Sequence, residues 1–163
     1  MDFYYGGIFI DQSVKTQNFR LLQTAKRLNE QYHIYAVSRG LSDPAANILY
    51  TLMEPDGVIT QNDLAIMWCY PKQTVNFTIQ GLVKKGYVQL EQLPGGRNRK
   101  SVSPTAKGQA YCREVLTPLI EAEERSLLRL SEEERALMVE LGEKQCAYFE
   151  DEIQKMTKEK EQA

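Results

Sequence analysis

The sequence has little of what metal and redox sites need. It contains one histidine, His33, and three widely separated cysteines, Cys69, Cys112 and Cys146. No two cysteines form a CxxC pair, so the closely spaced ligands of a structural zinc site are missing. We therefore expect no metal and no cofactor, and we interpret each cysteine as a small apolar residue in a reducing compartment. A cysteine-based redox sensor is the alternative.

Catalytic and membrane signatures are also missing. There is no Gly-rich phosphate loop and no serine-nucleophile motif, and the lone histidine has no evident partner, so we do not expect an enzyme. No apolar run approaches ~18 residues, which argues against a membrane span. The N-terminus, MDFYYGGIFIDQ, has no basic flank and does not resemble a secretory signal, so we expect a cytoplasmic protein.

Charge is distributed unevenly along the 163 residues, although the net charge is only −2. Residues 57–107 hold 7 Lys+Arg against 2 Asp+Glu, whereas residues 108–163 hold 8 against 14. Such a field orients a protein on a polyanion and keeps the acidic part away from it.

The stretch from 59 to 104 predicts a helix, a turn, a second helix and a hairpin. Thr60 can cap a helix that starts at Gln61, with Asp63 as the reciprocal acid. Pro71 suits the first position of the second helix, whose apolar stripe is followed by Gly86 as a stop. Two β-type runs, Tyr87-Val-Gln-Leu and Lys100-Ser-Val-Ser, then flank Pro94-Gly95-Gly96. This order of elements is a winged helix-turn-helix.

The run LAIMWCYPKQTVNFTIQGLVKKGYVQL, a Gly-rich basic tip and SVSPTAKG resemble the MarR family of bacterial transcriptional regulators. The resemblance implies a homodimeric repressor that binds a palindromic operator in double-stranded DNA. In its turn, the family usually has glycine where this chain has Cys69.

The flanking segments predict long helices. Apolar residues recur at helical spacing from about Ile8 to Ser38, whereas residues 1–7 show no periodicity and are expected to fray. Thr105 can cap a helix that passes Pro118, and Ser131 with Glu134 forms a capping box for a last helix, which the tail KEKEQA follows. Val58-Ile59 is expected to add one short strand to the wing. A 31-residue helix would run roughly 46 Å, so a second copy is expected to cover the overhang.

We therefore predict a mainly α fold with a small β wing, a winged helix-turn-helix flanked by N- and C-terminal dimerisation helices. The expected divisions are 1–40 for the N-terminal dimerisation helix, 41–107 for the DNA-binding domain and 108–163 for the C-terminal dimerisation helices.

The candidate DNA-binding residues lie on the second helix and on the wing. Those of the helix are Lys72, Gln73, Thr74, Asn76, Phe77 and Gln80; those of the wing are Arg97, Arg99 and Lys100. Glutamine can pair with adenine, threonine with several bases, and phenylalanine can contact a thymine methyl. The wing cations suit phosphates or the minor groove. A protein-interaction module that does not bind DNA is the alternative.

The resemblance also implies a small aromatic effector that binds between the dimerisation helices and the winged helix and releases DNA. Candidates for its contacts are Tyr32, His33, Tyr35, Trp68 and Tyr111. The alternative for each aromatic residue is a place in the core.

Overall fold

The computed structural model describes residues 3–5, 8–53, 57–94 and 99–161, and it divides the chain into two compact units, residues 1–117 and 118–163. The elements of the first unit are β1 (Phe3–Tyr5), β2 (Ile8–Ile10), α1 (Gln12–Ser38), α2 (Asp43–Met53), α3 (Gln61–Met67), α4 (Lys72–Lys84), β3 (Val88–Gln92) and β4 (Lys100–Pro104). α5 (Ala106–Leu127) crosses the boundary, and α6 (Glu132–Glu161) lies in the second unit. The predicted fold class is confirmed.

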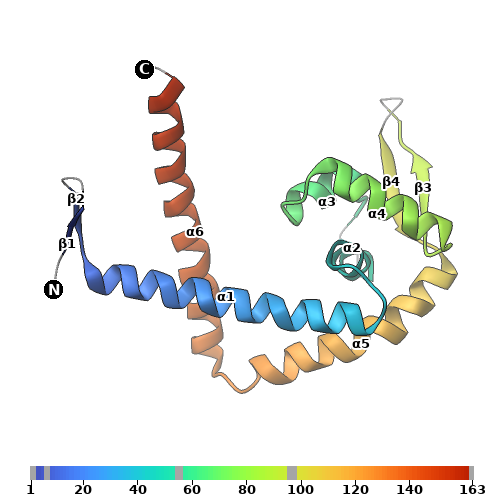
Figure 1. Cartoon of the computed structure of the whole chain (residues 1–163). Helices are drawn as coiled ribbons and strands as arrows, with labels where there is room; N and C mark the ends of the chain where they lie inside the picture. Colours follow the sequence, from blue (N-terminus) through green and yellow to red (C-terminus); the bar gives the residue numbers. More distant parts are fainter. Residues whose placement is uncertain (1–2, 6–7, 54–56, 95–98, 162–163) are drawn as a thin grey trace. The chain divides into compact units, whose positions relative to one another are not determined.

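The helix-turn-helix and its wing form one packed body. α4 packs against α2, α3 and β3, and β4 contacts α2 and α3 (Figure 1). β3 and β4 are antiparallel, with Leu90 opposite Val102. Thr60 forms an isolated bridge with Ser101, and the Val102 N–H donates to the Ile59 carbonyl at 2.8 Å. The segment expected to be a short third strand at Val58-Ile59 therefore contacts the wing through this bridge and bond but does not form a strand.

The core of this body comes from every element of the winged helix and from α5. Its fully buried side chains are Ile48, Leu49, Leu52, Leu64, Val75, Ile79, Val88, Cys112 and Leu116. They follow the apolar spacing of the sequence, because one helical face of α2 and of α4 is turned inward.

The first helix begins later than predicted. Ile8–Ile10 is a strand that pairs with Phe3–Tyr5, so the expected helix from Ile8 and the expected fraying of residues 3–5 are both wrong. Asp11 explains the start, because its carboxylate accepts hydrogen bonds from the backbone N–H groups of Ser13 and Val14.

Two further boundaries also differ from the sequence prediction. Pro71 is the N-cap of α4 and not its first helical residue, with extended backbone at ψ 138°. α6 runs on to Glu161, into the segment expected to be a tail, because lysines and glutamates are good helix formers. The capping boxes at Thr60 and at Ser131 are confirmed, and the helix passes Pro118 without ending.

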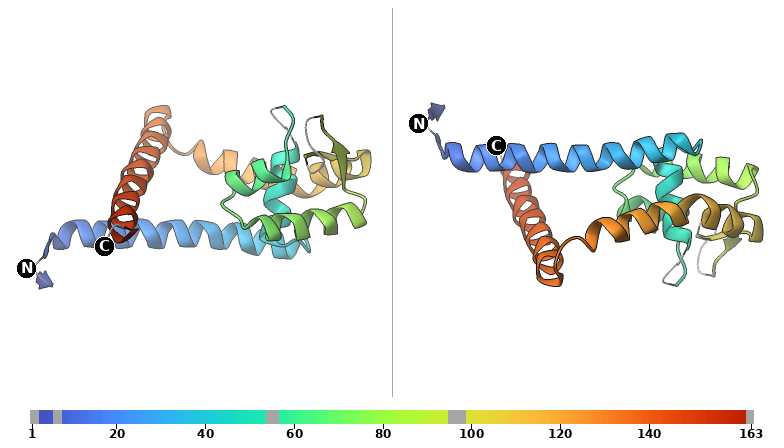
Figure 2. Two further views of the ribbon diagram at one scale, coloured as in Figure 1. Left: turned by 90° about the horizontal axis from the view of Figure 1, so that it is seen from above. Right: turned by 90° about the horizontal axis from the view of Figure 1, so that it is seen from below.

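Most of α1 is not packed within its own unit. Residues 13–34 are all exposed, and Ala36 is the first buried residue of the helix. Only the C-terminal end of α1 therefore packs against the winged helix, and the N-terminal turns extend beyond it (Figure 2). The second unit is similar, since every described side chain of α6 is exposed except the half-buried Arg135.

Candidate nucleic-acid interface

The turn between α3 and α4 has a defined geometry. The Cys69 N–H donates to the Ile66 carbonyl and the Tyr70 N–H to the Ala65 carbonyl, which is a Schellman motif. Cys69 has φ 52°, the left-handed conformation that a glycine adopts easily. The chain therefore makes this turn with cysteine in place of the family's usual glycine.

α4 presents an outer face opposite its buried stripe of Val75, Ile79 and Leu82. The predicted contact residues of α4 are all exposed except the half-buried Thr74. Lys72 precedes the buried Ile79 by seven residues, so it lies at the N-terminal end of the helix on the side of the stripe. We define the outer face by the other five residues: Gln73, Thr74, Asn76, Phe77 and Gln80. The Gln80 side-chain amide donates to the Asn76 side-chain oxygen at 3.3 Å, so these two amides are held together one turn apart. The structure thus brings five of the six predicted residues together on one surface, and Lys72 is the exception.

The wing adds cations beside this face. Arg99 and Lys100 are exposed where β4 begins, and the Arg99 carbonyl accepts from the Leu93 N–H at 2.9 Å. The hydrogen bond from Thr60 lowers the pKa of the Asp63 carboxyl most, and the positive charge of Arg99 lowers it further. Arg97, the third predicted wing residue, lies outside the described residues.

The wing is attached to α5 by the predicted Thr105 cap and by further contacts that the sequence argument missed. The Thr105 hydroxyl donates to the Gly86 carbonyl at 2.6 Å, and the Gly108 N–H donates to the Thr105 hydroxyl at 3.0 Å. The Tyr87 and Tyr111 rings stack with centroids 4.2 Å apart and planes 6° apart. The signal available in the sequence was Gly108 three residues after the capping Thr105, because a glycine allows another backbone to approach closely.

The effector candidates do not form a single cluster. Tyr35 and Tyr111 share Arg39, whose guanidinium lies 5.2 Å from the Tyr35 ring and whose carbonyl accepts from the Tyr111 hydroxyl at 3.4 Å. The Tyr35 hydroxyl donates to the Val115 carbonyl at 2.6 Å. Trp68 lies apart from them, donating to the Thr51 hydroxyl at 2.9 Å.

The remaining two candidates lie on the exposed part of α1. His33 pairs with Asp43 at the start of α2, with 2.9 Å between Nδ1 and Oδ1, and Tyr32 has 38% of its surface exposed. The hydrogen bond to Asp43, and then its charge, raise the pKa of His33 above its ordinary 6.5.

The cysteines have different environments. Cys112 is buried in the core, where burial raises the pKa of its thiol and makes the thiolate scarcer. Cys69 and Cys146 are exposed. Within the described residues, no group of His, Cys, Asp and Glu side chains is arranged to hold a metal ion, and no helix is long and apolar enough to cross a membrane.

Comparisons with known proteins agree with this architecture. Residues 39–97 match the model of the MarR family. No curated protein matches the sequence. AbsC, a MarR family transcriptional regulator from Streptomyces coelicolor, superposes with a TM-score of 0.74 at 17% identity, over 88% of this chain and 99% of AbsC.

Two further structures are similar. MepR from S. aureus in its DNA-binding conformation gives a TM-score of 0.70 at 19% identity, over 83% of this chain and 98% of MepR. NadR in complex with 4-hydroxyphenylacetate gives 0.66 at 22% identity, over 78% of this chain and 89% of NadR. The resemblance predicted from the sequence is confirmed for the central segment and for the fold.

Proposed function

We propose that this protein is a transcriptional regulator that binds double-stranded DNA as a homodimer. The proposal starts from the central segment, which matches the MarR family, and from the fold, which is that of MarR regulators. The outer face of α4 carries the proposal. It is the exposed side of the second helix of a helix-turn-helix, and it bears side chains that can bond to base edges.

The charges on this surface support a nucleic acid as the partner. α4 contains no Asp or Glu, and it has Lys72 and Lys84 at its two ends. The exposed Arg99 and Lys100 then continue the positive surface on the wing. We infer that α4 enters the major groove and that the wing follows the phosphates of the same duplex.

The exposed apolar side chains of α1 and α6 support the homodimer. On α1 they include Phe19, Leu22 and Leu28, each between 57% and 59% exposed. A 27-residue helix is about 40 Å long, so a second copy can cover many such side chains. A twofold dimer presents two α4 helices to one side of a palindromic operator, about 34 Å apart, and bound there it acts as a repressor.

The Arg39 guanidinium beside the Tyr35 ring, with Tyr111 bonded to the Arg39 carbonyl, suits an effector that combines an aromatic ring with an acid. The cation attracts the carboxylate, and the two rings supply apolar contact. NadR was solved with 4-hydroxyphenylacetate, a ligand of this class. We propose that an aromatic acid binds at this group and releases the DNA, with Tyr32, His33 and Trp68 as the remaining candidate contacts.

The decisive measurement is the salt dependence of duplex affinity. For B-DNA the slope of log K against log salt is about −0.9 per phosphate contacted. Replacing both Arg99 and Lys100 by Ala removes two cations from each wing of the homodimer. It should therefore weaken binding to every duplex and make that slope about 3.6 units less steep. A wild-type protein that shows no salt-dependent duplex binding refutes the proposal.

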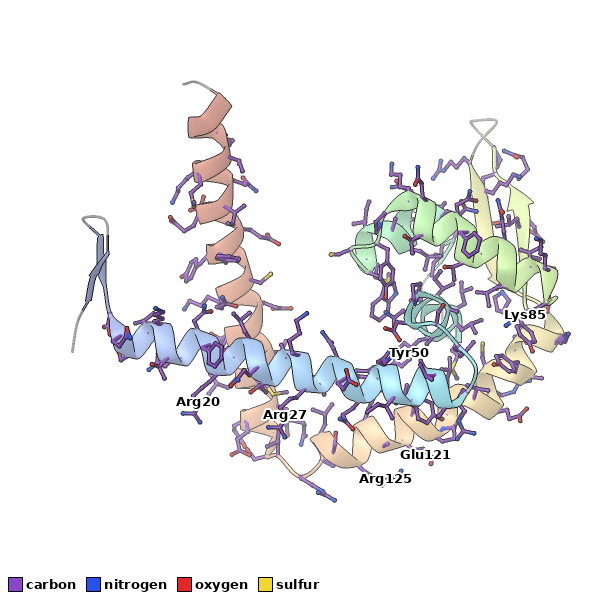
Figure 3. The ribbon with its side chains drawn as sticks, in the orientation of Figure 1. Arg20, Arg27, Tyr50, Lys85, Glu121 and Arg125 are labelled. Atoms are coloured by element: carbon purple, nitrogen blue, oxygen red, sulfur yellow. The ribbon has the colours of Figure 1, made fainter. Side chains whose placement is uncertain are left out.

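Lys26 and Arg27 offer a matched control, because they too are adjacent exposed cations, but on α1. Arg27 and Arg20 project from the same side of that helix (Figure 3). Replacing Lys26 and Arg27 by Ala should leave the salt slope unchanged. An equal change in both double variants would mean that net charge, and not the wing, determines the slope.

A further inference from the structure

Phe77 is the most exposed large apolar side chain that the structure describes, with 80% of its surface accessible. At about 100° per residue, its position on α4 lies nearly opposite the buried Val75 and Ile79. The helix cannot turn this ring inward without exposing its core stripe. Phe77 therefore stays on the outer face of α4 whatever rotamer it adopts.

The neighbours of Phe77 on this face are polar and uncharged. Gln73 and Gln80 lie within one turn of it on one side, and Thr74 lies on the other. Asn76 and Gln80 are already hydrogen-bonded to each other, which restricts the directions in which their free amide groups point. A single phenyl ring thus lies among groups that pair with the polar edges of bases.

This pattern favours DNA over a protein partner. Protein interfaces are centred on patches in which several apolar side chains are contiguous. The residues beside Phe77 on α4 are instead amides, a hydroxyl and Gly81, which has no side chain. In the major groove, the C5-methyl of thymine is the apolar group on an otherwise polar base edge. A lone ring between hydrogen-bonding side chains matches that surface.

We propose that Phe77 is a specificity-determining residue that packs on the 5-methyl group of a thymine in each half of the operator. The inference rests on the proposed function, because it requires α4 to lie in the major groove. It adds a chemical requirement that DNA binding alone does not impose: one position of each half-site must carry a pyrimidine with a C5-methyl.

Replacing thymine by deoxyuridine tests this contact, because deoxyuridine keeps the base pairing and removes only the methyl group. The full-length protein first selects its preferred duplexes from a random pool, and each thymine of the winning duplex is then replaced in turn. Loss of one methyl contact should weaken binding about fourfold. Replacement in both half-sites should weaken it about fifteenfold.

Phe77→Ala should bind the thymine and deoxyuridine duplexes equally, and the exposure of Phe77 means that this variant should fold normally. Ile66→Ala is the matched control, since Ile66 is 69% exposed on α3, and it should keep the full deoxyuridine penalty.

Three outcomes would overturn the inference while leaving the proposed function intact. They are salt-dependent binding that tolerates deoxyuridine at every position, a selected consensus without thymine, and a Phe77→Ala variant that keeps the wild-type penalty. Wild-type protein that binds no duplex in dilute buffer would instead refute the proposed function itself.

Discussion

Cys69 ends α3 in the backbone motif with which glycines end two other helices. Gly40 after α1 has φ 67° and Gly86 after α4 has φ 72°. At both places the N–H groups of the glycine and of the next residue donate to carbonyls of the last turn, as they do at Cys69. A side chain in this conformation is strained, and glycine is not. The cysteine is therefore tolerated in the turn, but the turn does not require it.

Replacing Cys69 by Gly should stabilise the winged helix by up to about 1 kcal/mol, because relief of strain exceeds the extra chain entropy of glycine. Replacing it by Val should destabilise by about 1 kcal/mol or more, since β-branched residues are rare outliers at positive φ. Urea unfolding followed by the fluorescence of Trp68, the only tryptophan, measures both. Equal stabilities of the Gly and Val variants would contradict the strain argument.

Gly108 is constrained by space and not by φ. A Cβ built on it would overlap the backbone carbonyl of Tyr87, which cannot move away as a flexible side chain could. Gly108→Ala should therefore destabilise the protein by about 1–3 kcal/mol. Gly81 on α4 is the control, because a Cβ there meets no atom within 4 Å, and Gly81→Ala should stabilise by about 0.5–1 kcal/mol. Unfolding curves that rank the two variants in the opposite order would exclude the close approach at Tyr87.

At the scale of elements, the helices and the wing were predictable where their signals are local. The Thr60 capping box and the Gly86 stop each act within a few residues and appear as expected. The two strands predicted on either side of the Pro-Gly-Gly turn also pair with each other, while Gly95 and Gly96 lie outside the described residues. The start of α1 was predicted too early, because Ile10 and Val14 have the four-residue spacing of a helix. Asp11, which lies between them, is the N-cap of α1, so the helix begins after it.

The candidate effector group could not be predicted with the same precision. The bond from Tyr35 to Val115 joins residues 80 apart in the chain, and that from Tyr111 to Arg39 joins residues 72 apart. Helical spacing gives the face of a residue but not its partner on another helix. For this reason neither Arg39 as a neighbour of Tyr35 and Tyr111 nor Thr51 as the partner of Trp68 could be predicted.

The contact between α1 and α2 should depend on pH through His33 and Asp43. Because Asp43 raises the pKa of His33 in the folded chain, the stabilisation is fully present below the unfolded pKa and is lost as pH rises through the raised value. Unfolding measured between about pH 5.5 and pH 8.5 should show a steeper loss of stability with rising pH in the wild type than in His33→Gln.

Asp43→Asn should flatten this pH dependence as His33→Gln does, because either change removes the same ion pair. Superimposable profiles for the wild type and His33→Gln would show that the exposed pair contributes nothing measurable. Raising the salt concentration should reduce the difference between them, since both groups are about half exposed.

At the scale of the whole molecule, the exposed apolar side chains are the surface through which we expect the chain to form its proposed dimer. A shallow apolar groove on α6 is lined by Leu141, Tyr148 and Phe149 beside the polar Lys144 and Gln145. Leaving so many apolar groups in water on two helices favours association. The same groups would be covered in a dimer. Because the proposed DNA-binding species is the dimer, and dimer formation depends on protein concentration, the apparent DNA affinity should rise with protein concentration.

Replacing both Leu141 and Tyr148 by Asp should convert the protein into a monomer at micromolar concentration. Each contact occurs twice across a twofold axis, and a buried side chain contributes about 1.5–3 kcal/mol, so we expect at least about 100-fold weaker dimerisation. Sedimentation equilibrium measures this directly. Ile66→Asp is the control, because Ile66 is more exposed than Leu141 but lies on α3, and that variant should remain dimeric.

The monomeric variant should also lose its preference for palindromes, because a single α4 binds only one half-site. If the wild type sediments as a single chain, or if both variants remain dimeric, the dimer does not form through α6.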